Sequence, residues 1–338
     1  NGFHMLDFAN EATVGHDSSG NNNDFTANNL TGVVTPRQGY NGGNSYVYSA
    51  SNAGGGGGGG AGGVGGASVS GSTAGAGGAG RTSTITGSSV TYGGGGGGGS
   101  WGTAGGAAGS GGGGAGKLGG SSTGNANPGT DGLGGGGGGA GYASADWQAG
   151  GDGGSGRVII RYATSHGDLT SANSGSKTTS GSDTIYQWTT VGSGSITFPG
   201  SSSISVQYLV LGGGGGAEFG GGGGGGMLEG TLTITGGTSH TVTVGDGGTG
   251  ASPYPSPGAA TNGGSSVFSS ITALGGGRGG GGDSGASPTS GGAGGGGGTH
   301  NSAATTGGAG TGQDDSDLDV LFDVPTNGTQ SDTGAGGE

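Results

Sequence analysis

The sequence predicts an all-β fold in which short antiparallel strands are combined with bundled polyglycine-II helices. Three observations lead to this prediction. Glycine accounts for 108 of the 338 residues and occurs in blocks. Segments with strand-like apolar patterns directly adjoin these blocks. No segment favours an α-helix, because each glycine in a helix costs about 1 kcal/mol relative to alanine.

The glycine blocks, such as 54–60 and 93–99, are not typical of collagen, because they lack a strict three-residue repeat and the chain has only 8 prolines. A polyglycine-II helix suits them better. It has three residues per turn, and its N–H groups point in three directions toward neighbouring chains. Without a Cβ, neighbours also come close enough for Cα–H···O contacts. Flexible linkers are the alternative, but the adjoining strand patterns argue against them.

Composition divides the chain into five segments. Glycine is scarcer at the two ends, and a Ser/Thr-rich stretch separates two glycine-rich copies. The predicted boundaries are 1–36 for an N-terminal segment, 37–165 for copy 1, 166–185 for a linker, 186–312 for copy 2 and 313–338 for a C-terminal segment.

Copy 1 contains a predicted hairpin and a predicted buried strand. Ile85 and Val90 flank a turn at Gly87 and Ser88, which is typical of a hairpin. The run GRVIIRY at 156–162 is continuously apolar at its centre, which indicates a buried strand.

Copy 2 has the clearest strand patterns. Residues 206–211 form an apolar strand that runs directly into polyglycine. Within 230–248, apolar residues alternate with threonine on both sides of a Gly-Gly turn, which predicts a hairpin with one buried face. A hairpin at 186–198 and two short strands at 265–277 are also expected. The aromatic residues expected in the core are Tyr162, Trp188, Phe198 and Tyr208.

Charge and cysteine content narrow the classes of function. The net charge is −13, from 20 acidic and 7 basic residues, and the scattered cations form no basic patch. Nucleic acid is therefore not an expected partner. The absence of cysteine excludes disulfides, thiolate catalysis and cysteine-ligated zinc. No apolar run has the length needed for membrane insertion.

No motif predicts catalysis. GGGGAGKL at 111–118 approaches a phosphate-binding loop, but Leu118 stands where a magnesium-binding hydroxyl is needed, and no strand precedes it. The five histidines are not paired at metal-ligand spacing, and no nucleophile–base–acid set is recognisable. We therefore expect neither an enzyme nor a cofactor.

Two acidic clusters offer oxygen ligands that calcium could use, but they lack the glycine and distal glutamate of a helix–loop–helix calcium site. The simpler interpretation of both is a turn rich in Asp and Asn. The clusters are Asp17, Asn21, Asn23 and Asp24, and Asp315, Asp317 and Asp319.

Aromatic residues outside the clear strands are candidates for contact with a receptor. Exposed aromatic side chains in loops often anchor a binding partner. The alternative is a structural role, in which they hold layers of glycine together. The candidates are Trp101, Tyr142, Trp147, Phe219 and Tyr254.

The two copies resemble the glycine-rich domain of phage tail fibres and related surface proteins. The resemblance rests on VQYLVLGGGGG at 206–216, EGTLTITGGTSHTVTVGDGG at 229–248, GGSSVF at 263–268 and the closing GGSGRVIIRY at 153–162. It implies strands that cap polyglycine-II helices, with receptor specificity in the loops between the helices. Copy 1 lacks the usual opening strand and copy 2 lacks the closing one, so either the copies complete each other or the chain is incomplete.

The two ends resemble a second family, a lectin-like (LamG/SPRY-like) module of marine phage tail proteins. FHMLDFAN at 3–10, DSSGNNNDFTANNL at 17–30 and DVLFDVPTN at 319–327 carry this resemblance. It implies a small β-sandwich fragment built from both termini, with the glycine-rich copies inserted into one of its loops. The alternative is that these pieces are unrelated strands.

Together the resemblances imply a structural and adhesive component of a phage tail fibre or another virion surface fibre. Its expected location is the virion surface or the extracellular space. Its expected partners are a host cell-surface glycan or protein, other virion fibre proteins, and further copies of itself, as in a trimer.

Three other functions compete with this one. The first is a purely structural fibre or capsid decoration protein that binds no receptor. The second is an ice-binding protein, which regular rows of threonine or alanine on one face would favour, although the sequence displays no such row. A hydrolytic fibre ranks last, because acidic residues are sparse and scattered.

Overall fold

The described part of the chain lies in one of its two units, Pro36–Glu338. The predicted lectin-like segments, 1–36 and 313–338, lie outside the described residues except for Pro36. The computed structural model describes residues 36–49, 52–69, 73–101, 104–119, 125–143, 146–171, 175–252, 259–282, 286–300 and 303–312.

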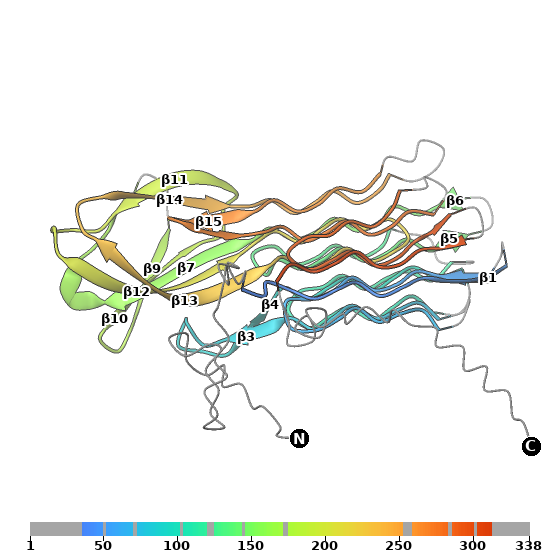
Figure 1. The fold of residues 1–338 in the computed structure, drawn as a ribbon, viewed down its shortest axis with the longest axis horizontal. Helices are drawn as coiled ribbons and strands as arrows, with labels where there is room; N and C mark the ends of the chain where they lie inside the picture. The colour runs from blue at the N-terminus through green and yellow to red at the C-terminus, as the bar shows by residue number, and fades with distance from the viewer. Residues whose placement is uncertain are drawn as a thin grey trace, which may run out of the picture. The chain divides into compact units, whose positions relative to one another are not determined.

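Two five-stranded sheets form a β-sandwich, and all strand pairs within them are antiparallel (Figure 1). Sheet 1 consists, in order, of β13 (Met227–Thr235), β12 (Ser203–Leu211), β7 (Arg157–Ala163), β10 (Asp183–Trp188) and β9 (Ser176–Ser180). Sheet 2 consists of β16 (Ile271–Ala273), β15 (Ser266–Phe268), β14 (Ser239–Val244), β11 (Gly192–Thr197) and β8 (Thr170–Ser171). The predicted all-β fold is therefore confirmed.

The sandwich core is built from side chains that alternate along the strands and point between the sheets. Tyr162, Trp188 and Phe198 are buried in it, and Tyr208 packs against it. The rings of Tyr162 and Phe198 meet edge to face, with centroids 5.3 Å apart. The core positions predicted for these four aromatic residues are confirmed, although Phe198 lies just beyond the end of β11.

The closing strand of copy 1 completes the sheet of copy 2. β7 comes from copy 1 and lies between β12 and β10, which both follow it in the sequence. In the register, Ile160 is paired with Tyr208 on one side and with Tyr186 on the other. The segment that we predicted as a linker, 166–185, differs from that prediction, because it contributes β8, β9 and the start of β10. The two copies therefore belong to one folded unit.

A hairpin from copy 1 covers part of the outer face of sheet 1. It consists of β3 (Arg81–Ser83) and β4 (Val90–Tyr92), joined through the predicted turn, where Gly87 has a φ of 86°. Ile85 and Tyr92 pack in a second buried cluster with residues of sheet 1 such as Ile159. Sheet 1 is thus buried on both faces near this hairpin.

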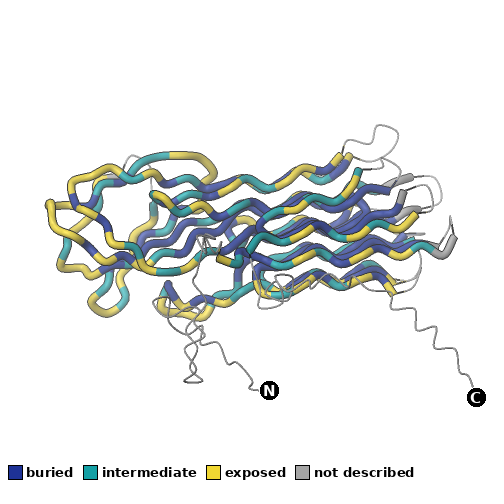
Figure 2. Tube along the Cα trace, viewed as in Figure 1, coloured by how far each residue is buried: buried dark blue, intermediate teal, exposed yellow. Residues whose placement is uncertain are grey.

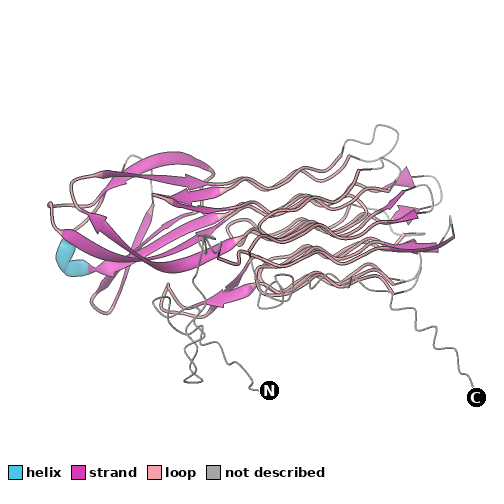
Figure 3. Ribbon diagram, in the orientation of Figure 1, coloured by secondary structure: helices cyan, strands magenta, loops and turns pink. Residues whose placement is uncertain are grey.

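The sheets are continued by glycine segments without regular strand structure (Figure 3). In these segments, backbone hydrogen bonds replace the side-chain core. Gly156 precedes β7 in sheet 1, yet its N–H donates to the carbonyl of Gly245, which follows β14 in sheet 2, at 2.9 Å. Gly213 bonds to Gly264 in the same way at 2.9 Å. Packed sheets stand about 10 Å apart because side chains fill the space between them. Where the side chains end, the two layers come into direct hydrogen-bonding contact.

The hydrogen bonds between glycine segments follow a three-residue period. Every third N–H along residues 55–60 donates to the same neighbouring segment, and the two N–H groups in between donate to two other neighbours. The polyglycine-II conformation stays a prediction, which this period supports. The pairs are, in order, Gly55 to Gly99, Gly56 to Gly297, Gly57 to Gly66, Gly58 to Gly96, Gly59 to Gly294 and Gly60 to Gly63.

The inner glycine segments leave no room for side chains. Residues 212–227 are all buried (Figure 2). A Cβ added to Gly222 would lie 2.0 Å from the carbonyl oxygen of Gly215, and one added to Gly58 would lie 2.0 Å from that of Gly222. These contacts are with backbone, which cannot move aside, so glycine is required at both positions.

At the end of the glycine segments that is farther from the sandwich, the chain forms short hairpins. Figure 1 shows this for β1, β5 and β6. β18 lies against β1 and therefore belongs to the same end. Helical structure among the described residues is limited to the 3₁₀ turn η2 (Thr164–His166), and none of their helices could span a membrane. The hairpins are β1 (Tyr46–Ser49) with β2 (Asn52–Gly54), β5 (Tyr142–Ala143) with β6 (Asp146–Trp147), and β17 (Thr299–His300) with β18 (Ala303–Ala304).

Candidate binding surfaces

Two of the predicted receptor-contact residues come together in one hairpin. Tyr142 on β5 and Trp147 on β6 are directly paired in the antiparallel register. The structure describes the backbone of this hairpin, and Cβ atoms at paired positions lie about 4.5–5.5 Å apart. The hairpin therefore places two aromatic residues next to each other at the end of the glycine segments.

Trp101 lies beside β2 at the same end. Its N–H donates to the carbonyl of Ala53 at 3.0 Å, and the preceding Ser100 forms an isolated antiparallel bridge with Gly54. The side chain of Trp101 is partly buried. Trp101 therefore belongs to the same region as the hairpins, with only part of its ring accessible.

Phe219 does not fit the prediction of a receptor contact, because its side chain is fully buried, with 0% exposure. It lies in a turn that joins the buried glycine segments 212–216 and 220–226. Its carbonyl accepts a hydrogen bond from Gly99 N–H at 2.8 Å. Burial of Phe219 instead fits the alternative, in which an aromatic side chain holds layers of glycine together. Tyr254 and all seven calcium candidates lie outside the described residues.

The surface of the glycine segments carries regular rows of small residues, which the sequence analysis missed. Along 73–79 and 104–110, every third residue is exposed, and Ala108 is exposed in addition. The two segments are hydrogen-bonded side by side, with Gly77 N–H donating to Ala107 at 2.9 Å and Gly80 N–H to Ser110 at 2.8 Å. The rows consist of Thr73, Ala76 and Ala79, and of Ala104, Ala107 and Ser110.

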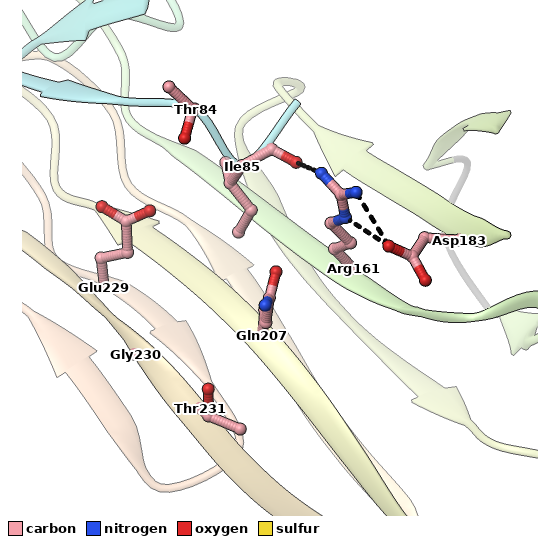
Figure 4. Close-up of a pocket in the computed structure, with 8 residues that line it drawn as sticks. All are labelled: Thr84, Ile85, Arg161, Asp183, Gln207, Glu229, Gly230 and Thr231. Carbon is pink, nitrogen blue, oxygen red and sulfur yellow. Dashed lines mark hydrogen bonds and ion pairs between the residues drawn. The ribbon is translucent and has the colours of Figure 1, made fainter. Parts of the chain in front are cut away.

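A polar groove with a volume of about 480 Å³ lies on the outer face of sheet 1, next to the β3–β4 hairpin (Figure 4). Four strands and the hairpin contribute to it, and Gln207 is paired with Arg161 on one side and Thr231 on the other. The lining residues are Thr84 and Ile85 from the hairpin, Arg161 from β7, Asp183 from β10, Gln207 from β12, and Glu229, Gly230 and Thr231 from β13.

The cation of the groove is paired within the protein. The Nε and Nη2 atoms of Arg161 both lie 2.8 Å from Oδ2 of Asp183, and Nη1 donates to the carbonyl of Ile85 at 3.3 Å (Figure 4). The guanidinium therefore joins two strands of sheet 1 to the hairpin above them. Each of its three nitrogens thus has a protein acceptor, which accounts for three of its five N–H groups.

The second carboxylate of the groove is also tied to the hairpin. Oε1 of Glu229 accepts a hydrogen bond from Oγ of Ser83 at 2.5 Å. Nearby, Nη2 of Arg81 donates to the carbonyl of Met227 at 2.6 Å. Burial lowers the pKa of the Arg81 guanidinium, and the negative charge of Glu229 opposes this shift. The charges of Arg81 and Glu229 thus offset each other.

Three neutral side chains remain available in the groove. Gln207, Thr84 and Thr231 are exposed, and within the described ranges their side chains make no hydrogen bond. An amide and two hydroxyl groups can each donate and accept hydrogen bonds. Alternation along β12 and β13 identifies their outward positions in the sequence. Their convergence with Arg161 and Asp183 depends on strand pairing, which the sequence does not give.

Comparison with known proteins identifies one family. The glycine-rich domain family matches the chain twice, over residues 7–163 and 170–338, and the division between the matches lies close to the predicted end of copy 1. No curated protein and no solved structure matches the chain. The matches include the ends that we compared with a lectin-like module, and nothing in them refers to phage tail fibres or lectins. The chain belongs to the glycine-rich domain family.

Proposed function

We propose that this protein is a structural and adhesive component of a phage tail fibre or another virion surface fibre. In this proposal the glycine segments are the scaffold, and the hairpins at their far ends contact a glycan or protein on the host surface. The pairing of Tyr142 with Trp147 in the β5–β6 hairpin is the observation that carries the proposal.

The glycine segments suit this role because their backbone groups bond to neighbours in three directions. A scaffold held in this way loses little conformational entropy when its hairpins bind a partner. Tyrosine and tryptophan are the residue types that most often dominate binding energy at protein interfaces. Membership of the glycine-rich domain family is compatible with this function and does not specify it.

The test is binding of the labelled protein to a panel of marine bacteria. Trp147→Ala is the test variant, and Val191→Ala is the matched control, because Val191 is an exposed apolar residue, 45% accessible, between β10 and β11. We expect saturable, strain-specific binding that Trp147→Ala weakens at least about tenfold and Val191→Ala leaves unchanged. Thermal unfolding first establishes that both variants fold.

Two results would contradict the proposal in different ways. If the folded protein binds none of the strains, the purely structural fibre becomes the better explanation. If both variants weaken binding equally, the protein is adhesive but the β5–β6 hairpin is not its contact surface.

The exposed rows favour ice binding as a second candidate function. Thr73, Ala76 and Ala79 repeat every third residue, next to a parallel row at 104–110. The test is thermal hysteresis of the protein solution, with Ala107→Gln placed in the rows and Ala259→Gln on a separate exposed segment. Ice binding predicts hysteresis that only Ala107→Gln removes, and its absence in the unmodified protein would exclude this function.

A further inference from the structure

We propose that the groove on the outer face of sheet 1 is a binding site for a neutral saccharide. The groove is formed by the sandwich and the β3–β4 hairpin, so the inference does not depend on attachment through the β5–β6 hairpin. Its volume of about 480 Å³ falls within the range of about 300–1,000 Å³ that is usual for small-molecule sites.

The charges of the groove disfavour an anionic ligand. Recognition of a carboxylate or phosphate requires a cation with N–H groups directed at the ligand. Arg161 already directs three of its five N–H groups at Asp183 and the carbonyl of Ile85, and Asp183 neutralises its charge. The net charge of −13 also repels anions as they approach.

A cationic ligand is disfavoured for a related reason. The carboxylate of Asp183 already faces Arg161 at 2.8 Å. Glu229 accepts a hydrogen bond from Ser83 and lies close enough to Arg81 to oppose the shift in its pKa. A bound cation would therefore have to compete with Arg161 for Asp183 and with the hydroxyl of Ser83 for Glu229.

The remaining side chains match a ligand with many hydroxyl groups. Each hydroxyl of a sugar can donate and accept, and so can the amide of Gln207 and the hydroxyls of Thr84 and Thr231. Gln207 stands on β12 between the other groups of the groove, with Thr231 on one neighbouring strand and Arg161 on the other (Figure 4). A carboxylate oxygen of Glu229 adds an acceptor at the rim.

The experiment is a calorimetric titration of the full chain with neutral sugars and with one anionic sugar. The neutral probes are glucose, galactose, mannose, N-acetylglucosamine and lactose, and sialyllactose is the anionic probe. The test variants are Gln207→Ala and Thr231→Val. The matched controls are Ser205→Ala and Thr233→Val, which are paired with each other on the same two strands and lie outside the groove.

We expect at least one neutral sugar to bind and sialyllactose to bind more weakly than lactose. Gln207→Ala should weaken binding about tenfold, because a polar group that contacts the ligand is lost. The control variants should stay within about twofold of the unmodified protein, as is usual for surface substitutions. Thermal unfolding of all four variants separates loss of the site from loss of the fold.

Three outcomes would overturn the inference. They are no binding of any neutral sugar at millimolar concentration, equal weakening by the test and control variants, and tighter binding of sialyllactose than of lactose. Trp147→Ala separates the two proposals, because it should weaken attachment to cells and leave binding of the sugar in the groove unchanged.

Discussion

The sandwich and the glycine segments stabilise the same chain in opposite ways. In the sandwich, hydrogen bonds run between neighbouring strands of a sheet, and buried side chains such as Ile160 and Phe268 join the two sheets. In the glycine segments, hydrogen bonds run in three directions, and little but backbone is buried. The sandwich is stable because side chains fill the space between its sheets. The glycine segments are stable because their backbones are in direct contact.

At the junction between the sandwich and the glycine segments, direct backbone hydrogen bonds take over from side-chain packing. Gly226 N–H, just before β13, donates to the carbonyl of Leu274, just after β16, at 2.8 Å. In the adjacent residues, the same two segments form β13 and β16. These strands belong to opposite sheets, whose side chains pack between them. A glycine framework can therefore be joined to an ordinary sandwich without a linker, because the change requires only the loss of Cβ atoms.

The largest expected effect comes from adding one methyl group to the glycine framework. Gly222→Ala places a Cβ 2.0 Å from the carbonyl oxygen of Gly215. Because backbone on both sides must move, we expect a loss of more than about 3 kcal/mol in the free energy of unfolding, measured by chemical denaturation. Gly63→Ala is the control, since its Cβ would meet nothing closer than 3.5 Å. Similar stability of the two variants would contradict the close-packed arrangement.

High pH should lower the stability of the sandwich. Burial raises the pKa of the Tyr162 hydroxyl above its usual range, whereas in the unfolded chain it titrates near pH 10. Above that pH the unfolded state loses the proton and the folded state keeps it. Stability should therefore fall by up to about 1.4 kcal/mol per pH unit above pH 10. Denaturation of the protein and of Tyr162→Phe from pH 8 to pH 11.5 tests this. Equal slopes for both would show that Tyr162 is not responsible.

Removing one methyl group from the sandwich should cost less than adding one to the glycine framework. Ile160 is fully buried between the sheets. Ile160→Val should lower the free energy of unfolding by about 1 kcal/mol, because the small cavity is tolerated. Chemical denaturation alongside Gly222→Ala gives the comparison directly. A larger loss for Ile160→Val than for Gly222→Ala would reverse the contrast between the two regions.

The smallest effect is expected at the partly exposed ion pair of the groove. The side chains of Arg161 and Asp183 are 23% and 30% accessible. Asp183→Asn should cost less than about 1 kcal/mol, because solvent screens such pairs. The loss should shrink further in high salt. A loss above about 2 kcal/mol, unchanged by salt, would indicate that the pair holds the hairpin on sheet 1.

Several elements of the fold could be predicted from the sequence because their signals are local. The alternation of Leu232 and Ile234 with threonine identifies β13, and GRVIIRY identifies β7. The hairpins predicted at 186–198 and within 230–248 are wrong, because each of these turns connects a strand of sheet 1 to a strand of sheet 2. The turn at Gly87 also follows from adjacent residues. The candidate binding surfaces could not be predicted in this way. The pairing of Tyr142 with Trp147 and the groove around Gln207 appear only when distant segments are assembled.

By itself, the sequence determined that this chain is all-β, where its strands meet glycine, and which aromatic residues enter the sandwich core. These properties follow from the order of residues along short stretches. Only the tertiary structure decided that β7 lies between β12 and β10, that Phe219 is buried, and that the exposed row at 73–79 lies beside the row at 104–110. The physical reason is that a glycine segment carries no side chains to select its neighbours. Its place in the framework is set by hydrogen bonds to segments that are remote in the sequence.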